Sequence, residues 1–77
     1  MHKVIMVDWL DAHTEDSWNP PDVAKEMCPL IVTSVGFVLA EDEQKIVLSA
    51  MVSDHAVSMV QCIPAGCIVK REVLNDI

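Results

Sequence analysis

The amino-acid sequence predicts an all-β fold: a small antiparallel barrel of five strands, with one short helix between the first and second strands. Apolar residues alternate with a period of two along most of the chain after residue 29, which is typical of strands. The clearest helix signal is short and is bounded by Pro20 and Pro29. A chain of 77 residues forms one small domain at most, which we expect to span residues 1–77.

The first strand is expected at residues 3–10, where Ile5, Val7 and Trp9 fall on one face. The acidic segment 11–19 has no regular period and is expected to be a loop. Tryptophan is seldom left fully exposed. We therefore expect Trp18 to pack with Trp9 in a small cluster that pins this loop.

The helix is expected at about residues 20–27. Asn19 is a candidate cap, and Pro20 suits the first helical position. The helix is short because Pro29 disfavours helical geometry in the residue before it. Val23 and Met27 lie four positions apart, so they would dock one helical face on the barrel.

The other four strands are expected at about residues 30–39, 44–52, 56–63 and 67–74. Gly36 lies inside the first of these and indicates a bend or a close backbone approach. The segment 64–66, Pro-Ala-Gly, is expected to be a tight turn in which Gly66 permits a positive φ.

The strands carry apolar residues on both faces, although a chain of this length has little interior to cover them. We expect one face of each strand to line the core and the other to contact copies of the same chain, which would also cover free strand edges. The predicted oligomer interface consists of Leu30, Val32, Val38, Val47 and Met51.

The chain has 12 acidic and 5 basic residues and a net charge of −7. Binding to phosphate backbones depends on clustered bases, so nucleic acid is disfavoured, and Lys70 and Arg71 are the best candidates if any is bound. The sequence contains no stretch of about 20 apolar residues, so no membrane span is expected. No export signal is recognised, and the three cysteines indicate reduced thiols in a cytoplasm.

Two clusters are candidate metal sites, and each has a simpler structural interpretation. The acidic cluster could bind a divalent cation, but it lacks the spacing of a calcium loop and is also typical of a solvated loop. Its members are Asp8, Asp11, His13, Glu15 and Asp16. Cys62 and Cys67 lack the paired spacing of a zinc site and suit buried apolar positions. No cofactor is expected. An enzyme is not expected either, because the sequence shows no coupled nucleophile and base.

Three stretches carry a resemblance to a known family. They are W-x-D-A-H at 9–13, S-V-G-F at 34–37 and I-P-x-G-C-I at 63–68. In this order the chain resembles a family of small proteins from tailed phages and marine metagenomes. The resemblance implies an Sm-like, also called SH3-like, barrel that forms a ring of copies in the cytoplasm of a host cell. Sm-like proteins often bind RNA, but this chain has no tyrosine and no clustered bases that would form a basic rim.

Three hypotheses follow for the function. The first is a non-enzymatic, phage-encoded protein that forms a homo-oligomeric ring and acts through protein–protein interaction. The second is an Sm-like ring that binds RNA or DNA, which rests on analogy of fold alone. The third is an acidic adaptor that binds a basic host or phage protein through residues 11–16 and 41–43.

Overall fold

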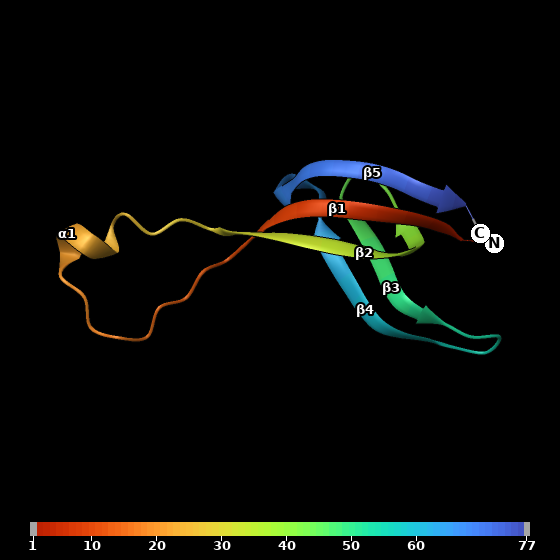
Figure 1. Cartoon of the computed structure of the whole chain (residues 1–77), viewed down its shortest axis with the longest axis horizontal. Helices are drawn as coiled ribbons and strands as arrows, with labels where there is room; N and C mark the ends of the chain where they lie inside the picture. The colour runs from red at the N-terminus through yellow and green to blue at the C-terminus, as the bar shows by residue number, and fades with distance from the viewer. Residues whose placement is uncertain (1, 77) are drawn as a thin grey trace.

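The computed structural model describes residues 2–76 and contains one antiparallel sheet with the strand order β4-β3-β2-β1-β5 (Figure 1). The elements are β1 (Lys3–Asp11), α1 (Pro21–Ala24), β2 (Leu30–Glu41), β3 (Lys45–Val52), β4 (Val57–Pro64), the 3₁₀ turn η1 (Ala65–Cys67) and β5 (Ile68–Asp76). The predicted all-β fold of five antiparallel strands, with a short helix between the first two, is confirmed. The sheet is open rather than closed, so β4 and β5 are its two free edges.

The core is small and lies inside the curl of the sheet. Its fully buried hydrophobic residues come from β1, β3 and β4: Ile5, Val7, Ile46, Leu48 and Ile63. Ile5, Val7 and Trp9, which alternation places on one face of β1, all face this core, because Trp9 also packs against the cluster. The Trp9 Nε1 donates a hydrogen bond to the Ser34 hydroxyl at 3.0 Å, so the indole is fixed to β2 rather than to the loop that follows β1.

Gly36 allows the backbone of β2 to approach that of its neighbour β3 closely. A Cβ at this position would lie 2.9 Å from the Ser49 carbonyl oxygen and 3.3 Å from the Leu48 Cβ. The pairing of β2 with β3 also shifts register between Val38 and Ala40. Glycine and a bulge are the usual means of bending a strand, and the close approach predicted at Gly36 is confirmed.

The two faces of β2 are reversed relative to the sequence-based prediction. Val32 pairs with Trp9 and is half-buried, and Val38 packs against the core. Ile31 and Val35 point to solvent instead, with Ile31 70% exposed. Alternation alone gives two apolar faces here, and the choice between them is made by the small residues Ser34 and Gly36, which face the buried side chains of β1 across the pairing.

An ion pair fastens β5 to the far end of β2, although these strands are not neighbours in the sheet. The Arg71 Nε and Nη2 donate to the two Glu41 carboxylate oxygens at 2.6 and 2.7 Å. Both side chains are about one-third exposed, at 31% and 32%. Bidentate geometry favours this pair over an ordinary surface ion pair, and it holds the sheet in its curled form.

The turn before β5 differs from the prediction. Residues 65–67 form η1, and its Ala65 N–H donates to the Gln44 carbonyl at 2.8 Å. Neither glycine of the described chain has a positive φ, so Gly66 does not serve the role assigned to it. A 3₁₀ turn needs ordinary negative φ angles, which Pro64 and Ala65 already favour.

Residues 12–29, here called the arm, project from the β1–β2 end of the sheet and carry α1 (Figure 1). Every residue of the arm is exposed, and the chain measures 51 × 22 × 20 Å. The predicted helix 20–27 is reduced to four residues, Pro21–Ala24, with Pro20 rather than Asn19 at the cap position and no side-chain cap. The Asn19 amide instead donates to the Ser17 carbonyl at 3.2 Å.

Two predicted contacts of the arm are wrong. Val23 and Met27 do not dock α1 on the sheet, because both are exposed and the helix stands away from the strands (Figure 1). Trp18 does not pack with Trp9, because Trp18 is 101% exposed. A helix this short buries too little to hold the arm against the sheet, since most helical stability in proteins comes from packing.

Candidate interaction surface

The described part of the chain exposes more apolar side chains than it buries. Five hydrophobic residues form the buried core, whereas fifteen large hydrophobic residues are exposed. The accessible surface is 5760 Å². A folded monomer of 8.5 kDa is expected to expose roughly 4,650 Å². The excess of about 1,100 Å² is the feature that most needs a functional explanation.

One apolar patch follows the β4 edge. Val57, Met59 and Val60 are all exposed, with Met59 at 69%. The strand runs Val-Ser-Met-Val-Gln-Cys-Ile-Pro and contains no charged residue. Natural proteins usually protect a free edge with charges or proline, because its unpaired backbone groups are a template for another strand. Apart from the terminal Pro64, β4 lacks this protection.

A hollow of about 480 Å³, here called the central hollow, opens beside this edge. Its apolar walls are Val35, Met59 and Val60, with Ala50 between them. Polar side chains of Thr33, Ser34 and Gln61 complete the lining.

The backbone at the central hollow is unusual. Met59 has a φ of 56°, a left-handed conformation that is rare for a residue with a long side chain. The pairing of β3 with β4 omits Ala50 and Met59, between the pairs Ser49–Val60 and Met51–Ser58. Strained residues of this kind persist only where the surroundings hold them, and they gather at functional sites.

Ser49 compensates for the interrupted pairing. It is fully buried, and its Oγ lies 2.7 Å from both the Met51 and the Ser58 carbonyl oxygens. The single hydroxyl hydrogen of Ser49 is donated to one of these carbonyls at a time. The Ser49 Oγ also accepts a hydrogen bond from the Met51 N–H at 3.3 Å. Ser49 therefore links the two strands where the backbone ladder does not.

Replacing this hydroxyl gives a stability prediction. Ser49→Ala removes a fully buried hydroxyl that serves the Met51 and Ser58 carbonyls, so we expect the free energy of unfolding to fall by about 1 kcal/mol. Urea denaturation at a fixed protein concentration measures the change. The matched control is Ser58→Ala, whose side chain is exposed and which should stay within about 0.5 kcal/mol of the parent protein. Equal effects of the two substitutions would contradict the assigned role.

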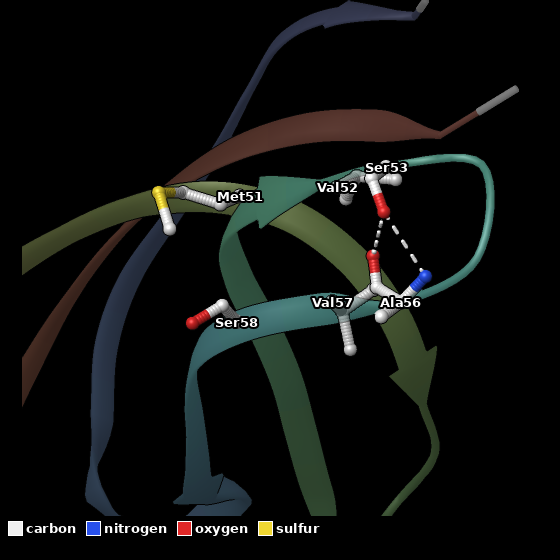
Figure 2. A pocket seen from close by; sticks show the side chains of 6 residues that line it. All are labelled: Met51, Val52, Ser53, Ala56, Val57 and Ser58. Atoms are coloured by element: carbon white, nitrogen blue, oxygen red, sulfur yellow. Dashed lines mark hydrogen bonds between the residues drawn. The ribbon is translucent and has the colours of Figure 1, made fainter.

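A second, smaller pocket of about 220 Å³, here called the hairpin pocket, lies at the β3–β4 turn (Figure 2). Figure 2 shows Met51 and Val52 at the end of β3 and Val57 and Ser58 at the start of β4. The Ser53 Oγ donates to the Ala56 carbonyl at 3.0 Å and accepts from the Ala56 N–H at 3.1 Å. These bonds use the polar groups of the turn, so the pocket offers mainly an apolar surface.

The opposite edge, β5, combines apolar and charged side chains. Val69, Val73 and Leu74 are exposed. The strand also carries Lys70, Arg71 and Glu72, so it differs from the uncharged β4 edge.

The predicted interface residues fall in different surroundings. Met51 is exposed on the hairpin pocket and Leu30 is exposed at the base of the arm. Val47 and Val32 are half-buried, and Val38 packs against the core. The β4 residues Val57, Met59 and Val60 were missed. The signal that could have identified them is the absence of charge from residue 55 to residue 69, which is visible in the sequence.

The two predicted nucleic-acid residues lie side by side on β5 but differ in availability. Arg71 is engaged by Glu41, whereas Lys70 is exposed. Register places Lys70 opposite Asp8, whose carboxylate accepts a hydrogen bond from Thr33 at 2.6 Å. A carboxylate at this position reduces the attraction of Lys70 for phosphate.

The candidate metal clusters are dispersed. Among the described residues, no group of three or more His, Cys, Asp or Glu side chains is placed to hold a metal ion. In the acidic segment, Ser17 donates from its hydroxyl and its backbone N–H to Glu15, and these bonds lower the pKa of that carboxyl. His13 Nδ1 lies 3.2 Å from the Cys28 carbonyl and joins the two sides of the arm. Cys28, Cys62 and Cys67 are free thiols, and the buried positions predicted for Cys62 and Cys67 are wrong, because Cys62 is exposed and Cys67 is half-buried.

Comparison with protein-family models, curated proteins and solved structures found no match to this chain. Within residues 2–76, no helix has the length and apolar content needed to cross a membrane.

Proposed function

We propose that this chain is a non-enzymatic interaction protein that assembles with copies of itself through the two free edges of its sheet. The observation that carries this proposal is β4, an uncharged and apolar edge strand in an open sheet. An edge of this kind pairs readily with another strand. The β5 edge of a second copy is a suitable partner because it presents its own apolar side chains, Val69 and Val73.

The amount of exposed surface supports this proposal. A specific protein–protein interface covers about 800 Å² on each partner. The excess surface of about 1,100 Å² per chain, to which the exposed arm also contributes, is of the same order as one such interface. A small core of five buried side chains also gains from assembly, because chains of this length rarely hold a stable fold by core packing alone.

The arrangement of the edges favours a ring. Contact of β4 with β5 of the next copy joins two different surfaces, and repetition of such a contact gives a closed ring or a filament. The strand order, with a 3₁₀ turn before β5, is compatible with the Sm-like barrel that the resemblance to phage and marine-metagenome proteins implies. On this proposal the protein acts through protein–protein contacts in the cytoplasm of an infected host cell.

The molar mass in solution tests the proposal. Size-exclusion chromatography with light scattering at micromolar concentration should give a single species at a multiple of 8.5 kDa. Native mass spectrometry of the same sample should give an integral number of copies. A stable 8.5 kDa species across this concentration range would overturn the assembly.

A further inference from the structure

The arm presents an apolar anchor that nothing in its own chain covers. Trp18 is 101% exposed and belongs to the arm, which projects from the sheet on the side away from the β3–β4 turn (Figure 1). Exposed tryptophan is unusual, because its large side chain contributes strongly when it is buried at an interface. The polar groups nearest to it in sequence are occupied locally, since Ser17 bonds to Glu15 and Asn19 bonds to Ser17.

The central hollow has the size and the chemistry to receive an indole ring. A cavity of 150 Å³ holds benzene, so about 480 Å³ is ample for the larger ring system of tryptophan. Val35 and Val60 provide apolar walls, and the Met59 sulfur can contact an aromatic ring favourably. Thr33 and Gln61 offer oxygen atoms to the indole N–H, which a buried tryptophan needs.

The positions of these two features indicate an occupant from a second copy. The arm projects away from the sheet, so Trp18 does not lie in the hollow of its own chain (Figure 1). The base of the arm lies beside the start of β5, because Trp9 pairs with Ile68. A copy that docks its β5 edge on β4 therefore brings the base of its arm to the β4 edge, along which Met59 and Val60 place the central hollow.

We propose that Trp18 of one copy packs in the central hollow of the neighbouring copy and so clasps the two subunits together. This inference rests on the proposed assembly through β4 and β5. It assigns the arm a role as an intersubunit clasp, and it gives the strained Met59 a role in shaping the hollow.

The test uses the full chain labelled with 5-fluorotryptophan, which reports Trp9 and Trp18 separately by ¹⁹F NMR. Trp18→Ala assigns the signals, and light scattering gives the mass of each sample. We expect the Trp18 signal of the assembled protein to lie away from that of free 5-fluorotryptophan. We also expect Trp18→Ala to raise the dissociation constant of the assembly at least about tenfold, because a central tryptophan is a typical hot spot.

Two leucine substitutions locate the contact. Ala50→Leu fills the central hollow, so the Trp18 signal should return toward the free value. Ala56→Leu adds the same bulk in the hairpin pocket and should leave the Trp18 signal unchanged. Both alanines are exposed, so neither substitution is expected to unfold the chain.

The outcomes separate this inference from the assembly on which it rests. An assembled protein whose Trp18 signal matches the free amino acid, and whose mass is unaffected by Trp18→Ala, overturns the clasp and leaves the assembly intact. An 8.5 kDa species overturns both. A monomer with a shifted Trp18 signal would show that the arm folds back on its own chain, which also overturns a contact between copies.

Discussion

Gly36→Ala is expected to lower the free energy of unfolding strongly. The added methyl carbon would lie 2.9 Å from the Ser49 carbonyl oxygen, a contact that real Cβ atoms essentially never show. The contacted atom belongs to the backbone of β3, so the steric clash is removed only if β2 and β3 move apart at this point. Overpacking of this kind costs about 1–3 kcal/mol. A core of this size supplies about 3–5 kcal/mol, so a large share of the margin of stability would be lost.

Gly66→Ala is the matched control, because nothing lies within 4 Å of a Cβ built at Gly66. Since Gly66 has no positive φ, alanine fits the native backbone and restricts the unfolded chain. A change between zero and a gain of about 1 kcal/mol is therefore expected. Urea denaturation at one protein concentration compares the two variants with the parent protein. A Gly36→Ala protein as stable as Gly66→Ala would show that β2 and β3 do not cross so closely.

Local patterns predicted the strands well because each strand is encoded by neighbours in sequence. Alternation placed Ile5, Val7 and Trp9 on one face of β1, which the structure turns toward the core, and Gly36 marked the close approach. The short helix was identified from its prolines, although only Pro21–Ala24 is helical.

The contacts that were missed depend on residues far apart in the sequence. Trp9 takes its partner from Ser34, 25 positions away, so pairing it with Trp18 on sequence proximity was wrong. The inward face of β2 carries Ser34 and Gly36 opposite the buried side chains of β1, and alternation along β2 alone cannot reveal this pairing. The left-handed Met59 has no local signature either, because glycine or asparagine is the usual residue there.

The exposed apolar surface was predictable in kind but not in place. A surplus of apolar residues in 77 positions indicates an uncovered surface whatever the topology. Its location depends on which strands are the edges, and that follows from the strand order. For this reason the predicted set included Val38, which packs against the core, and omitted Val60 on the β4 edge.

Cys62→Lys is expected to dissociate the assembly into monomers at concentrations at which the parent protein is assembled. Cys62 is exposed on β4 and lines neither the central hollow nor the hairpin pocket. A lysine on an edge strand opposes pairing, because docking a second strand would take its ammonium group out of water. The fold of the single chain should survive, since the flexible stem keeps the charge in solvent when no partner is present.

Two controls separate the charge at the edge from other effects. Cys62→Ser removes the thiol without adding charge and should leave the molar mass unchanged. Ala40→Lys adds the same charge at an exposed position on β2, which has a paired strand on each side, and should also assemble normally. Circular dichroism checks the fold of each variant, and light scattering gives its mass. If Cys62→Lys assembles as the parent protein does, β4 is not the edge that joins the copies, and the exposed apolar surface must be covered through another face of the sheet.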